Sequence, residues 1–129
     1  MDVRTLRRAS LAFALLAASA GTALAAGDPV KGKAEFSRCS GCHVLTGPAF
    51  AGPALTGVYG RKAGSAPGFH YSKALTDSGI TWDDTSLDAF LAAPSKVVPG
   101  TNMFSQVPDA QDRADVIAYL KTLSAPTAP

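Results

Sequence analysis

The amino-acid sequence predicts an all-α domain, with three main helices and further short helices joined by long loops. Three observations favour this class. Residues 109–123 carry apolar side chains at the i, i+3, i+4, i+7 spacing of an amphipathic helix. Residues 45–68 are rich in glycine and proline and have no sustained period, which indicates a long loop. No segment shows the sustained alternation of apolar and polar residues that is typical of a half-buried strand.

Four helices are predicted from their start and stop residues. Asp28 followed by Pro29 is typical of an N-cap and a first helical residue, and this helix should run to about Arg38. The others are predicted over His70 to Ser78, closed by Gly79, over Trp82 to Ala93, ended by Pro94, and over Asp109 to Leu123.

Two of these helices have clear internal signals. The helix before Pro94 should be capped among Asp84, Thr85 and Ser86. An irregular stretch is predicted over Ser95 to Pro108, and Asp109 then caps the last helix. The apolar face of that helix consists of Val116, Tyr119, Leu120 and Leu123.

The first 25 residues predict a signal peptide and not part of the domain. Three arginines precede an uncharged run over Ala9 to Ala26, and Ala23-Leu24-Ala25 is a small-x-small cleavage pattern. The alternative is a retained membrane anchor, but a spanning helix needs ~20 strongly apolar residues, and this run is rich in Ala and Ser. We therefore expect cleavage near Ala25/Ala26, a periplasmic mature domain over 26–129, and no stable membrane anchor after cleavage.

Charge argues against one class of function. From Ala26 onward the chain has nine basic and nine acidic residues, so the net charge of +2 belongs to the signal peptide. Nucleic-acid binding therefore has no electrostatic basis. The charges are nevertheless separated, because residues 27–73 sum to +4 and residues 74–129 to −4. Such a dipole can orient a charged partner.

The motif Cys39-Ser40-Gly41-Cys42-His43 contains both cysteines of the chain and one of its two histidines. Cys-x-x-Cys-His is the attachment signature of a c-type haem. The spacing suits this chemistry, because Cys39 and Cys42 can add to the two vinyl groups and His43 can then bind the iron. A large cofactor would also supply core that a domain of this length lacks.

Three other interpretations of the motif compete with haem attachment. A disulfide would close too small a loop to stabilise the fold much. A structural zinc ion needs four ligands, and beyond the motif the chain offers only His70. A thioredoxin-like redox pair needs a βαβ context that the sequence does not show.

Met103 is the expected second axial ligand, because it is the only methionine besides Met1. A thioether favours ferrous iron and raises the reduction potential, which suits an electron carrier. His70 is the rival ligand, although a solvent-facing or propionate-side position suits it better. A methionine that only fills the core is the structural alternative.

Further motifs extend over nearly the whole mature domain: Gly27-Asp28, Lys31-Gly32-Lys33, Phe36, Gly52-Pro53-Ala54-Leu55, Tyr59-Gly60-Arg61-Lys62, Phe69-His70-Tyr71, Gly79-Ile80-Thr81-Trp82, Pro99-Gly100-Thr101-Asn102-Met103 and residues 113–120. With them, the chain resembles the mitochondrial-type and purple-bacterial soluble class I cytochromes c. The resemblance implies the cytochrome c fold around one covalent haem, with His43 and Met103 as axial ligands.

The resemblance also implies roles for other residues. The carbonyl of Pro53 would hold the second nitrogen of His43. Residues near the haem propionates would be Arg61, Tyr71, Trp82 and Thr101. The terminal helices would cross at Gly32, Phe36 and Tyr119. Two positions depart from the family pattern, with Phe90 in place of a tyrosine and Leu75 in place of an asparagine. A lost hydrogen bond to the methionine sulfur would lower the reduction potential of the haem and a drier pocket would raise it, so the direction of the net change stays open.

The implied function is one-electron transfer and not catalysis. The expected partners are redox proteins of a respiratory or photosynthetic chain, such as a quinol-cytochrome c reductase, a terminal oxidase, a reaction centre or a periplasmic dehydrogenase, and the protein should be a monomer. The alternatives are a dedicated subunit of a dehydrogenase and a gas-binding or weakly peroxidatic haem protein. Basic residues expected on the docking face are Lys31, Lys33, Arg38 and Lys96, with Ser95 weakening it.

Overall fold

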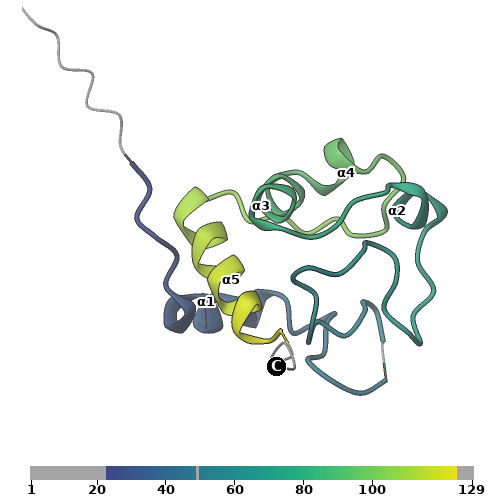
Figure 1. The fold of residues 1–129 in the computed structure, drawn as a ribbon, viewed down its shortest axis with the longest axis horizontal. Helices are drawn as coiled ribbons and strands as arrows, with labels where there is room; N and C mark the ends of the chain where they lie inside the picture. Colours follow the sequence, from purple (N-terminus) through teal and green to yellow (C-terminus); the bar gives the residue numbers. More distant parts are fainter. Residues whose placement is uncertain (1–22, 49, 125–129) are drawn as a thin grey trace, which may run out of the picture.

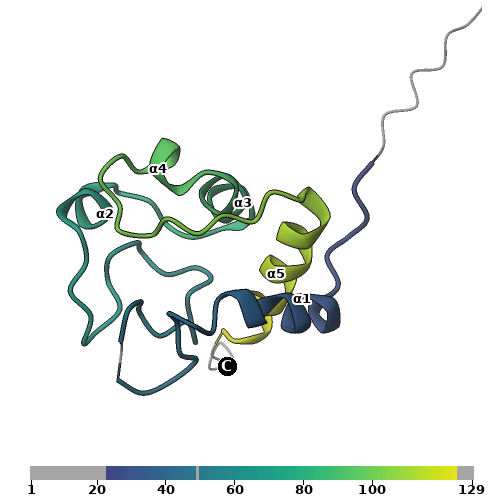
Figure 2. The same ribbon diagram turned by 180° about the vertical axis from the view of Figure 1, so that it is seen from behind.

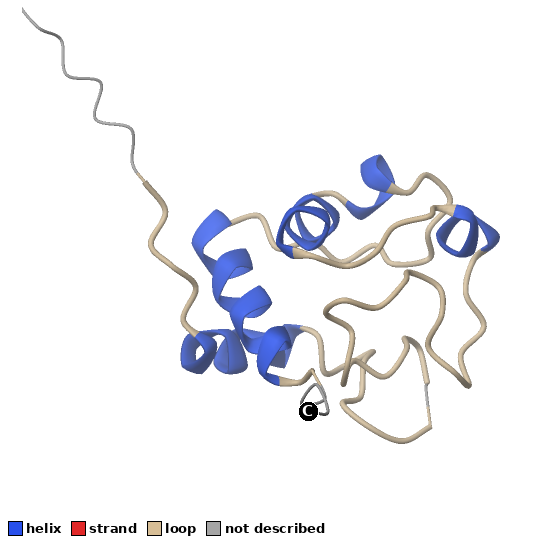
Figure 3. Ribbon diagram, in the orientation of Figure 1, coloured by secondary structure: helices blue, strands red, loops and turns tan. Residues whose placement is uncertain are grey.

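The computed structural model describes residues 23–48 and 50–124, so most of the predicted signal peptide lies outside it. The described chain forms α1 (Pro29–Glu35), α2 (Lys73–Asp77), α3 (Asp84–Ala92), α4 (Pro94–Val97) and α5 (Ala110–Thr122) (Figure 1). The predicted all-α class is confirmed. Within the described residues, extended pairing is limited to one bridge between Lys62 and Thr81 (Figure 3). The same residues contain no helix long and apolar enough to cross a membrane.

The terminal helices α1 and α5 cross at one end of the molecule, as both ribbon views show (Figures 1 and 2). The long loop between α1 and α2 lies at the other end, and α3 packs against α5. The helices and this loop thereby surround a central space.

Helix α1 starts as predicted. The carboxylate of Asp28 accepts hydrogen bonds from the backbone N–H groups of Val30 (2.8 Å) and Lys31 (3.3 Å), and Pro29 is the first helical residue. The α-helix ends at Glu35, and a 3₁₀ turn over Phe36–Arg38 continues it. The cysteine motif follows directly after this tighter turn.

The crossing of α1 and α5 depends on a glycine. A Cβ added to Gly32 would lie 1.9 Å from the carbonyl oxygen of Asp115. Next to this point the rings of Phe36 and Tyr119 meet edge to face, with centroids 5.4 Å apart. The predicted crossing at Gly32, Phe36 and Tyr119 is therefore confirmed.

The structure corrects the start of α2 and α3. Helix α2 begins at Lys73 and not at His70, because Ser72 is its N-cap and accepts from the N–H of Leu75 at 3.2 Å. Helix α3 begins at Asp84 and not at Trp82. Its cap is Asp83, which forms a capping box with Ser86.

The predicted irregular stretch Ser95 to Pro108 was wrong in its first residues. Pro94 does end the preceding helix, but it also opens the short helix α4, since proline suits a first helical position. The rest of the stretch, after Val97, is irregular as expected.

Helix α5 follows its prediction closely. Asp109 caps it by accepting from the N–H of Asp112 at 2.9 Å. Its inner face is buried through Val116, Ile117, Tyr119 and Leu120. Asp115, which is 3% exposed, accepts from the N–H of Asp28 (2.8 Å) and from Gln111 (3.0 Å). These hydrogen bonds, that from Asp28 first, lower the pKa of the Asp115 carboxyl.

Candidate functional site

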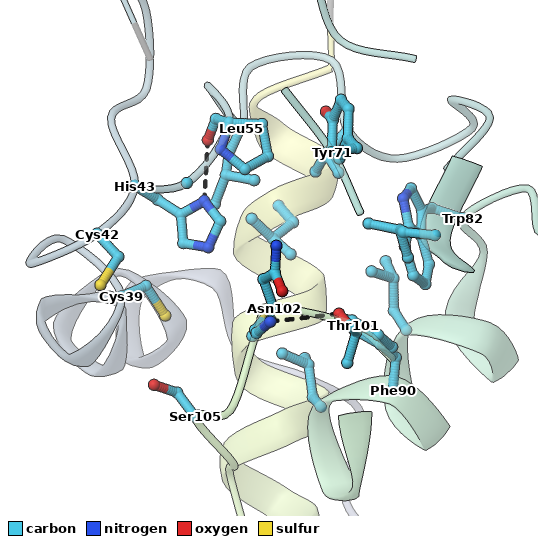
Figure 4. A pocket seen from close by; sticks show the side chains of 18 of the residues that line it. Cys39, Cys42, His43, Leu55, Tyr71, Trp82, Phe90, Thr101, Asn102 and Ser105 are labelled. Carbon is cyan, nitrogen blue, oxygen red and sulfur yellow. Dashed lines mark hydrogen bonds between the residues drawn. The ribbon is translucent and has the colours of Figure 1, made fainter. Parts of the chain in front are cut away.

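A cavity of about 290 Å³ lies in the central space between α5, α3, the cysteine motif and the loops (Figure 4). Its wall is mostly apolar and includes core residues such as Leu87, Leu91 and Val116. All nine predicted site residues line it, namely Cys39, Cys42, His43, Pro53, Arg61, Tyr71, Trp82, Thr101 and Met103. The fold thus gathers residues that are up to 64 positions apart in the sequence.

The cysteine motif forms a tight turn at one side of the cavity. The backbone N–H groups of Cys42 and His43 both donate to the carbonyl of Cys39, at 3.1 and 2.9 Å. The two cysteines form no disulfide with each other, and Cys39 is half-buried whereas Cys42 is exposed. Burial raises the pKa of the Cys39 thiol, and the charge of Arg38 partly offsets this.

The imidazole of His43 is fixed from two directions. Its Nδ1 lies 2.9 Å from the carbonyl oxygen of Pro53, and because a carbonyl only accepts, Nδ1 carries the proton and donates. Gly52 lies against the ring, since a Cβ there would be 2.7 Å from the imidazole Cε1. The other nitrogen, Nε2, is thereby left as a ligand atom, and Figure 4 shows it directed into the cavity.

Met103 lines the same cavity from the irregular segment after α4 and is half-buried. Its backbone N–H donates to the hydroxyl of Thr101 at 3.2 Å, and Thr101 is itself only 4% exposed. The rival ligand His70 is exposed and does not line the cavity.

Three further residues with polar groups line the cavity, and Figure 4 shows two of them, Tyr71 and Trp82, across from Cys39 and Cys42. The guanidinium of Arg61 donates to the carbonyls of Ala54 (3.1 Å) and Thr56 (3.2 Å). The hydroxyl of Tyr71 accepts from the N–H of Ala66 at 3.2 Å. Trp82 is buried, and its ring packs on Phe90.

This arrangement fits a haem. An apolar cavity, a turn that presents two thiols and an oriented imidazole nitrogen are the features that covalent attachment and iron ligation need. Among the described residues, no three His, Cys, Asp or Glu side chains come together as a metal site, so the zinc interpretation gains no support.

The model of the cytochrome c family matches residues 29–124. The chain belongs to the cytochrome c family. It is 52% identical to cytochrome c2 of Rhodomicrobium vannielii over 104 residues, which are 78% of this chain and 83% of that protein. It is also 52% identical to cytochrome c of Tetrahymena pyriformis, covering 75% and 90% of the two chains. The solved structure of cytochrome cH from Methylobacterium extorquens matches with a TM-score of 0.72 and 46% identity, covering 74% of this chain and 99% of that one.

This cytochrome c carries one covalently attached c-type haem, and Cys39 and Cys42 supply the two thiols. Its family membership makes it an electron carrier that works with redox protein partners. The cytochrome c fold expected from the sequence is confirmed.

The cavity wall also contains polar residues that were not predicted for the site: Lys62, Ser72, Asn102, Ser105 and Gln106. Three of them flank Met103, so proximity to the expected ligand was an available signal. The two departures from the family pattern, Leu75 and Phe90, both line the cavity and present only apolar atoms. The cavity wall is therefore apolar at these two positions.

Proposed function

We propose that this cytochrome is a periplasmic one-electron carrier whose haem iron is bound by His43 and Met103. The observation that carries the proposal is that both side chains line one apolar cavity, with the imidazole fixed by Pro53 and Gly52. The bound haem supplies a one-electron ferric/ferrous couple. The contribution of the chain is a rigid ligand set, which keeps the geometry of the site similar in both oxidation states.

The residues around the ligands have separate roles in this proposal. The carbonyl of Pro53 keeps His43 in one tautomer and one orientation, so that Nε2 is always the ligand atom. Phe90 and Leu75 exclude water from the cavity through their apolar surfaces. Thr101 holds the backbone of Met103 by accepting its N–H.

Arg61, Tyr71, Trp82 and Thr101 are proposed to compensate the haem propionates. A carboxylate removed from water needs hydrogen-bond donors or a positive charge. The guanidinium, phenol and indole groups that line the cavity provide both kinds of compensation. Arg61 is held in place by its two backbone carbonyl acceptors.

Residues 1–25 are proposed to be a signal peptide that is removed near Ala25/Ala26, which would place the mature domain, residues 26–129, in the periplasm. The basic start, the uncharged run and the small-x-small pattern support this. Mass spectrometry of the protein released from the periplasm should give a mature chain that starts at Ala26. Recovery of the full-length chain from the membrane fraction would refute it.

The partners proposed are those of a respiratory or photosynthetic chain: a quinol-cytochrome c reductase, a terminal oxidase, a reaction centre or a periplasmic dehydrogenase. We propose that the carrier is a monomer that binds them one at a time. Stable co-purification with one enzyme would instead identify a dedicated subunit.

Replacing Met103 by alanine tests the ligand assignment. The oxidised wild-type protein should show the sulfur-to-iron charge-transfer band, and Met103→Ala should abolish it because, among the residues that the structure describes, no other thioether lines the cavity. The matched control is His70→Ala, which removes the rival ligand and should leave the band unchanged. A band that survives in Met103→Ala would refute methionine ligation.

A further inference from the structure

Two uncharged segments of the chain meet at the cavity. Residues 44–60 and residues 97–108 contain no Asp, Glu, Lys or Arg. Both segments contribute to the wall, the first through residues such as Ala51, Pro53 and Leu55, the second through Thr101 to Val107. Segments that are separate in the sequence thus form a part of the cavity border that has no charged side chain.

The exposed part of this border is defined here as the uncharged mouth, and it consists of Ala51, Asn102, Phe104, Ser105 and Gln106. Figure 4 shows Ser105 on the same side of the cavity as Cys39 and Cys42, away from Tyr71 and Trp82. The uncharged mouth therefore adjoins the haem attachment turn.

An exposed aromatic side chain stands in the uncharged mouth. Phe104, directly after Met103, is 76% exposed. Phe50, the neighbour of Ala51, is 87% exposed. Covering such an exposed phenylalanine with a partner protein is favourable, because its apolar surface is removed from water. Aromatic residues are typical anchors of protein interfaces.

Of the basic side chains that line the cavity, Arg38 is paired with carboxylates, and none belongs to the uncharged mouth. Arg38 lines the cavity, but its guanidinium forms ion pairs with Glu35 (2.9 Å) and Asp112 (3.5 Å). Lys62 also lines the cavity and is exposed, and its backbone is bridged to Thr81, the residue before Trp82. The other basic residues predicted for docking, Lys31, Lys33 and Lys96, do not line the cavity.

We propose that the uncharged mouth docks a redox protein whose own docking face is uncharged and apolar, with Phe104 as the anchor. The inference rests on the proposed carrier function and names the class of partner. The absence of charge in both segments argues for such a partner, since an acidic face would lose water at the mouth without gaining ion pairs. During the encounter, one electron leaves the reduced cytochrome, and no bond changes and no proton moves.

The experiment measures the bimolecular oxidation of the reduced holoprotein by stopped flow. The probes are two small copper proteins, one with an uncharged apolar docking face and one with an acidic face, each reduced from copper(II) to copper(I). With the uncharged probe, the rate should change less than about threefold between about 10 mM and about 500 mM salt, because no charge steers the encounter. With the acidic probe, low salt should give no large acceleration.

Phe104→Ala should slow the reaction with the uncharged probe by about tenfold, since interface anchors contribute most of the docking energy. The matched control is Val30→Ala, because Val30 is equally exposed, at 78%, but lies on α1 and does not line the cavity. Gln106→Lys should introduce a low-salt acceleration with the acidic probe, which shows that this surface contacts the partner.

Three results would overturn the inference. They are an unchanged rate for Phe104→Ala, a rate for the wild type with the acidic probe that falls more than about tenfold with salt, or a stable dimer in sedimentation that Phe104→Ala abolishes. A failure of the carrier function itself is distinguishable. In that case even the small oxidant hexacyanoferrate(III) would not oxidise the reduced protein rapidly, whereas a wrong docking surface leaves that reaction intact.

Discussion

Replacing Gly32 by alanine tests how closely α1 and α5 approach each other. The added Cβ would lie 1.9 Å from the carbonyl oxygen of Asp115, 2.4 Å from its carbonyl carbon and 2.9 Å from the Cβ of Tyr119. Two of these atoms belong to the backbone of α5 and cannot rotate away as a side chain can. The two helices would have to separate by more than about 1 Å, which loosens contacts along the whole crossing.

The expected cost follows from two opposing effects. Overpacking a well-packed contact costs about 1 to 3 kcal/mol, and a clash with backbone belongs at the upper end. Alanine favours the helix over glycine by about 1 kcal/mol, which offsets part of this cost. The net destabilisation is about 2 kcal/mol, or a fall in the melting temperature of about 8 to 16 °C for a domain of this size.

Thermal and guanidinium unfolding of the holoprotein, followed by far-ultraviolet circular dichroism, measures this change. The control is the reverse substitution Ala34→Gly at an exposed position of the same helix, where only helix propensity changes. It should destabilise by about 1 kcal/mol. Propensity alone would make Gly32→Ala stabilising, so a higher melting temperature for this variant would refute the close approach of the helices.

Two further substitutions test contacts of the site and of the helix crossing. Gly52→Ala places a Cβ 2.7 Å from Cε1 of His43 and should weaken the hydrogen bond from His43 to the carbonyl of Pro53. Voltammetry should then show a reduction potential raised by up to about 60 mV, which for one electron corresponds to tenfold weaker binding of ferric relative to ferrous iron. A potential equal to wild type would mean that the ring is not confined. Asp115→Asn removes a carboxylate whose folded-state pKa is lowered by the N–H of Asp28 and by Gln111. The charge therefore stabilises the fold above the unfolded pKa, and this contribution is lost as the pH falls through the folded value. Denaturant unfolding should show the Asp115→Asn variant less stable than wild type at neutral pH, with the difference closing below pH 3.8; a constant difference would contradict the assignment.

The helix starts that the sequence predicted correctly are determined by residues that lie within a few positions of the start. Asp28 and Asp109 cap α1 and α5 as predicted, because each directly precedes a helical segment and faces its free N–H groups. The start of α3 was misplaced because several cap residues follow one another. Asp83 is the cap because its carboxylate accepts from the N–H of Ser86 while its own N–H donates to the Ser86 hydroxyl. The hydroxyl of Ser86 also donates to the carbonyl of Thr81, so the conformation of the chain before the helix selects the cap.

The candidate site was predictable to a larger extent, because its first part is one contiguous motif. Cys39, Cys42 and His43 follow from spacing, and Met103 follows from being the only methionine besides Met1. The family resemblance implied the other predicted residues, and all of them line the cavity. Their individual roles remain predictions. Asn102, Ser105 and Gln106 were not predicted, because the irregular segment after α4 has no period from which the direction of a side chain could be derived.

The charge of the docking surface could not be derived from the types of its residues alone, because it also depends on how their charges are paired in the fold. Arg38 was expected to contribute to a basic docking face because it adjoins the cysteine motif. Its partner Asp112 is 74 residues away in the sequence, and only the crossing of α1 and α5 brings the two together at 3.5 Å. The uncharged segments 44–60 and 97–108 are visible in the sequence, but their convergence on one cavity is a property of the fold. Arg38, paired with Glu35 and Asp112, and the exposed Phe104 line the same cavity. This combination favours short-range apolar contact over electrostatic attraction, so partners of this cytochrome should be distinguished by shape and hydrophobicity.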